Sequence, residues 1–111
     1  MDDMIKIYVY KNVLDRVKKF NCEVLLREAV EKVLSKPYYW VVYNRWYIFH
    51  LSEAEPINVY VSHEISSAWG SLSEKERTAL LKLINDEIEV LIKDLEVKVK
   101  PCVLTVKGGE A

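Results

Sequence analysis

The sequence predicts an α+β fold in which one strand followed by two helices occurs twice along the chain. The first observation is a repeat: "IKIYVYKNV" at residues 5–13 returns as "INVYVSHEI" at residues 57–65, a constant offset of 52 positions. The second is a change of apolar period within each copy, from two residues to about 3.6, as at the junction of a strand and a helix. The third is a capping box, "SEKE" at residues 73–76, which marks the start of a long helix.

The composition is that of one globular domain, or of two small units that share a core. Half of the 111 residues are hydrophobic and 30% are charged, which is too apolar for a disordered chain. No apolar run approaches the roughly 18–20 residues that span a bilayer, and the acidic start "MDDMIK" lacks the apolar segment of a secretory signal. We therefore expect a cytoplasmic protein in which Cys22 and Cys102 are free thiols. Abundant Lys, Glu, Ile and Val without any glutamine is a bias of thermophile proteins.

The first unit, residues 1–34, is predicted to begin with a strand that has one apolar face. Apolar residues alternate with polar and aromatic ones, which places the two kinds on opposite sides of a strand. The apolar side holds Ile5, Ile7 and Val9, and the other side holds Lys6, Tyr8 and Tyr10. Two interpretations of Tyr10 stay open: it stays on the outer face, or it leaves the strand and packs on a helix.

Two helices are predicted to follow this strand. Asn12 is a candidate N-cap for the first, which is short and stops near Asn21. Asn21 then caps the longer helix "CEVLLREAVEKVL", which the pre-proline Lys36 and Pro37 bring to an end.

The second unit, residues 56–94, repeats this order. Its strand alternates Ile57, Val59 and Val61 with Asn58, Tyr60 and Ser62. A short helix begins at Ser62 or His63 and buries Trp69, and the long helix follows the capping box. The helices of the two units align if about three residues are inserted after Phe20, so that Leu25 and Leu26 correspond to Leu80 and Leu81.

Two further stretches have no counterpart in the repeat. The linker, residues 35–55, contains "YYWVVYNRWYIFHL" at residues 38–51, with seven aromatic residues, and we expect an aromatic β-hairpin there. Core packing or an oligomer interface is favoured over a base-stacking platform, because only Arg45 supplies a positive charge. Residues 95–111 alternate Val97 and Val99 with lysines, which predicts a short C-terminal β extension that breaks at Pro101 and ends in a tail.

A strand with one apolar face needs a neighbouring strand and a core. Two copies of the unit supply both if their strands pair antiparallel as a ribbon above four helices. The linker is long enough for this pairing within one chain or between copies in a dimer. The bare outer face of a two-stranded ribbon has dimensions that fit the major groove of DNA.

The run "IKIYVYKNVLDRVKKFNCEVLLREAVEKVL" has an ending, "LLREAVEKVL", that is typical of one family's second helix. It resembles the ribbon-helix-helix superfamily of transcription factors, which includes the Arc, MetJ and CopG repressors. The resemblance returns more weakly in "INVYVSHEISSAWGSLSEKERTALLKLINDEIEVLI". Two such motifs in one chain are similar to the tandem ribbon-helix-helix regulators of archaeal filamentous viruses. The resemblance implies a sequence-specific regulator that binds double-stranded DNA as a homo-oligomer, in the host cytoplasm if the protein is viral.

The resemblance also implies which residues contact DNA. The base-reading positions are Lys6, Tyr8, Asn58 and Tyr60, with Met4 and Pro56 at the margin. The backbone amides that begin each second helix bind phosphate in this family, and they correspond here to Asn21, Cys22 and Ser73. Residues 1–50 carry a charge of +3 and residues 51–111 a charge of −4, so a polyanion is expected to favour the first half.

The sequence also suits a function other than DNA binding. An antitoxin-like or structural protein–protein interaction module would use the ribbon only as a dimer seam. No acid–base set, phosphate loop or metal-ligand spacing stands out, since His50 and His63 lie apart from any clustered cysteine or carboxylate. We therefore expect no enzyme activity, cofactor, metal, membrane contact or small-molecule substrate.

Overall fold

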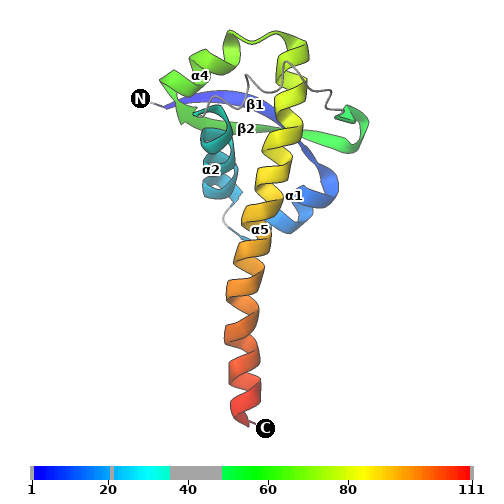
Figure 1. Cartoon of the computed structure of the whole chain (residues 1–111), viewed down its shortest axis with the longest axis vertical. Helices are drawn as coiled ribbons and strands as arrows, with labels where there is room; N and C mark the ends of the chain where they lie inside the picture. Colours follow the sequence, from blue (N-terminus) through cyan, green and yellow to red (C-terminus); the bar gives the residue numbers. More distant parts are fainter. Residues whose placement is uncertain (1, 21, 36–48, 111) are drawn as a thin grey trace.

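The computed structural model describes the backbone of residues 2–20, 22–35 and 49–110, and the side chains of 3–20, 23–35 and 49–97. Within those residues the protein is α+β, with one two-stranded antiparallel sheet and four α-helices (Figure 1). The elements in chain order are β1 (Asp2–Tyr10), α1 (Lys11–Val17), α2 (Cys22–Leu34), the 3-10 helix η1 (Leu51–Glu53), β2 (Ala54–Ser62), α4 (His63–Gly70) and α5 (Glu74–Glu110). A strand followed by two helices therefore occurs twice.

The sheet joins β1 and β2 of the same chain along their whole length. Lys6 lies opposite Asn58 and Ile7 lies opposite Ile57. Lys6 and Asn58 are also equivalent in the sequence repeat, so the centre of the ribbon pairs each copy with its own counterpart. Pro56 is accommodated because both strands of a two-stranded sheet are edge strands. Of the two pairings that the linker permits, this structure has the one within the chain.

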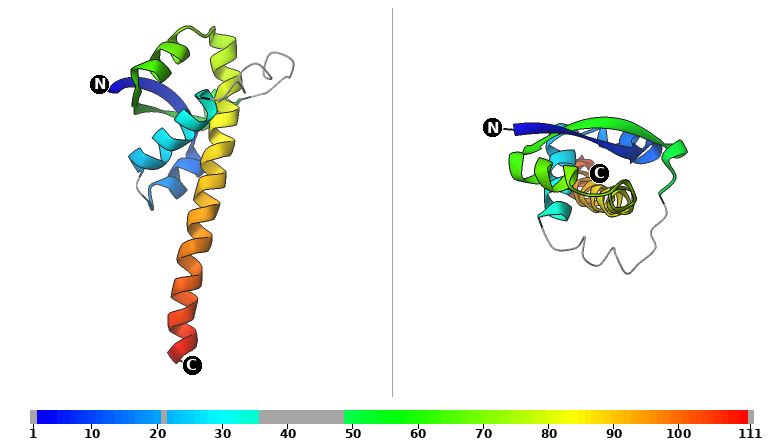
Figure 2. Two further views of the ribbon diagram at one scale, coloured as in Figure 1. Left: turned by 60° about the vertical axis from the view of Figure 1, so that its left-hand side comes forward. Right: turned by 90° about the horizontal axis from the view of Figure 1, so that it is seen from above.

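The helices cover one face of the ribbon and form the core with it. Figure 2 shows α2, α4 and α5 on the same side of the two strands. Of the six apolar side chains that point toward them from the strands, five are buried and Ile57 is half-buried; Ile7, Val9 and Val61 are fully buried. The predicted apolar faces of both strands are confirmed. The largest fully buried side chains contributed by the helices are Val13, Val17, Val30, Leu80, Ile84, Ile88 and Ile92.

Local hydrogen bonds fix where two of the helices begin. The Ser62 hydroxyl accepts from the Ile65 amide at the start of α4, 3.3 Å away. At the start of α5 the predicted capping box is confirmed: the Ser73 amide donates to Glu76 Oε1 (2.7 Å) and the Glu76 amide donates to Ser73 Oγ (3.2 Å). The predicted Asn12 cap is wrong, because α1 already begins at Lys11 directly after β1.

The predicted C-terminal β extension of residues 95–111 is also wrong, because α5 continues as one helix to Glu110. The buried stripe of Ile88 and Ile92 extends to the half-buried Leu95 at helical spacing. Arg16 Nη2 then holds Glu96 Oε1 at 2.9 Å and ties that turn of α5 to α1. Extending a formed helix is easier than starting a strand that would lack a neighbour in the sheet. The end of α5 projects well beyond the other elements (Figure 1).

The expected aromatic hairpin falls mostly on residues 36–48, which lie outside the described residues. The part that is described differs from a strand, since Leu51 belongs to the 3-10 helix η1. Trp69 of α4 is buried, as predicted. None of the helices in the described part of the chain combines the length and the hydropathy needed to cross a bilayer.

Candidate nucleic-acid interface

The outer face of the ribbon carries side chains that no described helix covers. Three cross-strand pairs follow one another along it: Met4 with Tyr60, Lys6 with Asn58, and Tyr8 with Pro56. Five of these six residues are exposed, and Tyr8 is half-buried. All four predicted base-reading residues therefore meet on one surface, with the polar pair at its centre and an aromatic residue at each end.

The dimensions of this face follow from strand geometry. Side chains on one face recur about every 6.6–6.8 Å along a strand, so the three pairs span roughly 13–14 Å. Directly opposite residues have Cα atoms about 4.5–5.5 Å apart across the ribbon. Such a ribbon fits a groove about 12 Å wide, and the major groove of B-DNA has that width.

A buried asparagine holds one end of the ribbon in place. Asn85 of α5 is 2% exposed, and its Nδ2 donates to the carbonyl oxygens of Tyr8 (3.0 Å) and Leu81 (2.7 Å). Its Oδ1 accepts from the Tyr10 amide at 3.0 Å. The side chain thus satisfies backbone groups of β1 that β2 does not reach. Sequence reasoning missed Asn85, although an asparagine within the apolar stripe of Leu81, Ile84 and Ile88 was a visible signal.

Tyr10 leaves the outer face of the ribbon. Its ring stacks on Phe49 with centroids 4.4 Å apart and planes 24° apart, and its hydroxyl accepts from the His50 amide at 3.1 Å. Neither interpretation of Tyr10 holds in full: its backbone stays in β1 opposite Ala54, while its ring turns from the outer face and stacks on Phe49, a residue just before η1, rather than on a helix. Tyr10 is therefore excluded from the candidate interface.

The two ends of the ribbon differ in charge. Helix α1 follows the end of β1, and this helix and the residues after it expose Lys11, Lys18 and Lys19. Helix α4 follows β2 at the opposite end and exposes Glu64. The first turn of α5 adds the exposed Glu74. The exposed Asp15 and Glu53 lie at the α1 end too, so a phosphate backbone would meet mixed charge beside α1 and negative charge beside α4.

The predicted phosphate-binding positions are described unequally. The Ser73 amide already donates to the Glu76 carboxylate, which lies where a phosphate oxygen would have to sit. Asn21 and the side chain of Cys22 lie outside the described residues. Beside the first turns of α2 there is a pocket of about 430 Å³, whose walls include Lys18, Glu23, Val24, Asn58 and Tyr60. This pocket adjoins the ribbon on its β2 side.

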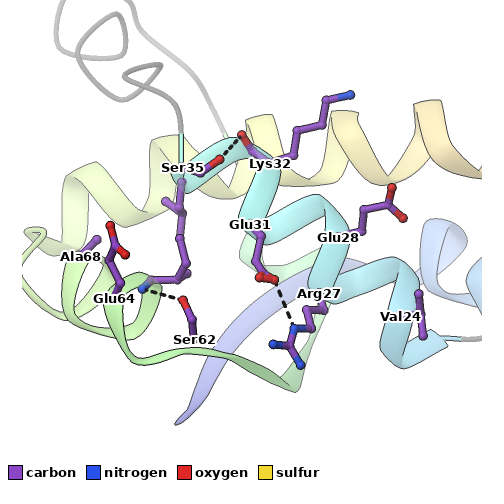
Figure 3. A pocket seen from close by; sticks show the side chains of 11 residues that line it. Val24, Arg27, Glu28, Glu31, Lys32, Ser35, Ser62, Glu64 and Ala68 are labelled. Atoms are coloured by element: carbon purple, nitrogen blue, oxygen red, sulfur yellow. Dashed lines mark hydrogen bonds and ion pairs between the residues drawn. The ribbon is translucent and has the colours of Figure 1, made fainter. Parts of the chain in front are cut away.

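A wider groove of about 970 Å³ runs between α2 and α4 (Figure 3). Its cations are engaged by carboxylates: Arg27 Nε lies 3.2 Å from Glu31 Oε1, and Lys32 Nζ lies 3.1 Å from Glu87 Oε2. Glu28 and Glu64 also line it. The groove therefore offers an anion little positive charge that is not already compensated.

Comparison with protein-family models, with curated proteins and with solved structures found no match to this chain. Among the described residues, no group of three or more His, Cys, Asp and Glu side chains could hold a metal ion. His63 Nδ1 lies 2.7 Å from Asp3 Oδ2 across the α4 end of the ribbon, which is a pair and not a ligand set. Within the described residues, the outer ribbon face is thus the candidate binding surface, because it places exposed polar and aromatic side chains next to one another.

Proposed function

We propose that this protein is a sequence-specific regulator of the tandem ribbon-helix-helix type, which inserts the β1–β2 ribbon into the major groove of double-stranded DNA. One observation carries the proposal: the inner face of the ribbon is buried, while its outer face presents Lys6, Asn58 and Tyr60 to solvent. A two-stranded ribbon on a rigid helical base is a shape that reads base edges.

The exposed side chains have the chemistry for reading bases. The Lys6 ammonium donates hydrogen bonds, and guanine offers O6 and N7 as acceptors in the major groove. The Asn58 amide both donates and accepts, which matches N6 and N7 of adenine. The hydroxyls of Tyr8 and Tyr60 add a donor or acceptor at each end of the face.

The expected affinity for any DNA sequence is modest. The net charge is −1, so non-specific binding depends on individual exposed lysines, among them Lys11 at the start of α1 and Lys18 and Lys19 just after its end. If these three lysines neutralise three phosphates, log K falls with log salt with a slope of about −3. Discrimination between sequences then comes mainly from the ribbon face.

A second candidate function is a protein–protein interaction module. Met4 is 49% exposed and Tyr60 is 52% exposed, and Met and Tyr are both enriched at protein interfaces. In this alternative the ribbon face packs on another protein chain and has no affinity for DNA.

Binding measurements with duplexes enriched from a random pool test the proposal. We expect the double variant K6A/Y8A to lose preference for the enriched duplex by at least about tenfold, since a good base contact contributes about 1–3 kcal/mol of discrimination. The control K93A removes the same charge from an exposed position on α5, on the part of the helix that lies away from the ribbon (Figure 1), and should keep the preference.

Two results would contradict the proposal. Unchanged discrimination by K6A/Y8A would mean that DNA is read elsewhere. Absence of any complex at low salt, together with a self-association that Tyr60→Ser abolishes in sedimentation experiments, would favour the protein–protein module.

A further inference from the structure

The centre of the ribbon face holds two different residues at equivalent positions. Lys6 and Asn58 lie directly opposite each other in the sheet, and each is the counterpart of the other in the sequence repeat. The approximate two-fold axis that relates the strands therefore passes between a lysine and an asparagine. Toward the ends, by contrast, Tyr8 corresponds to Tyr60.

This difference matters because the two side chains recognise different base edges. A ribbon made from two identical chains shows the same residue twice across its axis and matches a palindromic site. Here one side of the axis has a group that only donates, and the other has an amide that donates and accepts. The DNA sequence that this face binds most tightly therefore has different bases on the two sides of its centre, so it is not a palindrome.

The charge around the ribbon is a second and independent asymmetry. Because the strands are antiparallel, α1 and α4 lie at opposite ends of the ribbon (Figure 1). The α1 end exposes Lys11, Lys18 and Lys19 together with Asp15 and Glu53, whereas α4 contains no lysine or arginine and exposes Glu64. The α1 end offers ammonium groups that can contact phosphate and α4 offers no lysine or arginine, so the two orientations of the protein on a duplex differ in energy.

We infer that the protein binds duplex DNA in one direction, on a non-palindromic site that Lys6 contacts at guanine and Asn58 contacts at adenine. The α1 end of the ribbon lies against the phosphate backbone in this arrangement, and the α4 end makes the weaker contact. The inference rests on the proposed function and adds to it the class of sequence that the single-chain ribbon recognises.

Selection of duplexes from a randomised pool tests the inference with the full chain and two variants. The wild type should enrich a non-palindromic site, and exchanging its two central contacted bases between strands should weaken binding by about 5- to 150-fold. The variant Asn58→Lys presents lysine on both sides of the axis, so its enriched site should approach a palindrome. The variant Asn58→Gln keeps the amide chemistry and should keep the directional preference.

A charge reversal on the α4 end tests the second asymmetry. Glu64→Lys places a cation near the end of the ribbon that lacks one, and we expect tighter binding with a salt slope steeper by about 1. Nuclease protection should extend further on the α1 side of the wild-type site and become more even in this variant. Thermal melts of each variant show whether a loss of binding reflects a loss of folding.

The outcomes separate the inference from the function on which it rests. A palindromic wild-type site, or an Asn58→Lys variant with the wild-type preference, would overturn the directional inference while DNA binding stands. A failure of every duplex to be enriched would overturn both.

Discussion

The two β-α-α halves of the chain bury nearly the same residues and expose different ones. Ile7, Val9 and Val13 in the first half correspond to Val59, Val61 and Ile65 in the second, and all six are buried. On the exposed side Lys6 corresponds to Asn58, and Lys11 corresponds to His63. Packing therefore conserves apolar character and volume within the repeat, whereas the outer face is free to differ in chemistry.

The second helices of the two halves differ more deeply. Helix α2 has 13 residues and α5 has 37. The buried Asn85 of α5 aligns with Val30 of α2, which is fully buried and apolar. An amide thus fastens β1 to α5 from within the core, and at the corresponding place α2 supplies only an apolar contact. The two strands therefore differ in the helix contacts beneath them as well as in their exposed side chains.

The largest loss of stability is expected when a core side chain of either half is shortened to alanine. Ile7→Ala removes three carbons from a fully buried site and should lower the free energy of unfolding by about 2–5 kcal/mol. Val59→Ala removes two carbons at the equivalent strand position and should cost about 2 kcal/mol. Urea denaturation measures both. An Ile7→Ala loss below about 1 kcal/mol, or a larger loss for Val59→Ala, would contradict the view that the two inner faces form one core.

An intermediate loss of stability is expected when the side-chain amide of Asn85, which links α5 to β1, is removed. Asn85→Ala leaves the Tyr10 amide and the Tyr8 carbonyl without a partner, which should cost about 1–3 kcal/mol. Amide exchange at Tyr10 should accelerate at the same time. The control Asn12→Ala removes a single local hydrogen bond, from the Val13 amide to Asn12 Oδ1, at an exposed site where water can replace it, and should cost a few tenths of a kcal/mol. A variant at position 85 with wild-type stability and a slow Tyr10 amide would show that the anchor is dispensable.

Local sequence patterns predicted most of the elements because those patterns report directly on secondary structure. Alternation identified both strands and the side of each that is buried. The capping box located the start of α5 to within one residue, since its two side chains act on neighbouring backbone groups. The same alternation brought the candidate ribbon face together as expected, with Lys6 and Asn58 at its centre.

The errors arose where a pattern fits two structures or where the partner is distant in sequence. The alternation of Val97 and Val99 with lysines suits a strand or a helix, and continuity with the buried stripe of α5 decides for the helix. The asparagine at position 85 stands out within an apolar stripe, but its partners Tyr8 and Tyr10 lie more than 70 positions away, so the local pattern could not reveal what it binds. The stacking of Tyr10 on Phe49 has the same origin.

The smallest change in stability is expected at two surface ion pairs, one in α2 and one at the equivalent position in α5. Arg27 pairs with Glu31 in α2, and Lys82 pairs with Asp86 in α5, in each case four residues apart. The hydrogen bond from Lys82 to Asp86, 2.6 Å long, raises the pKa of Lys82, while arginine stays charged at any pH that the fold tolerates. The two halves should therefore respond differently to alkali.

The sign of this difference follows from linkage. Because the Lys82 pKa is raised in the folded state, the stabilisation by this pair is complete below the ordinary lysine pKa of about 10.4 and is lost as the pH rises through the raised value. Asp86→Asn should thus cost about 0.3 kcal/mol at pH 9, because surface pairs of this kind are weak, and the cost should shrink as the pH rises through the raised Lys82 pKa. Glu31→Gln should cost a similar amount at pH 9 and in stronger alkali.

Denaturation curves compare each variant with the wild type at the same pH, so the titration of other groups cancels. A loss of the Glu31→Gln effect in alkali would indicate that the fold itself changes there, and the contrast between the two helices would then have no meaning.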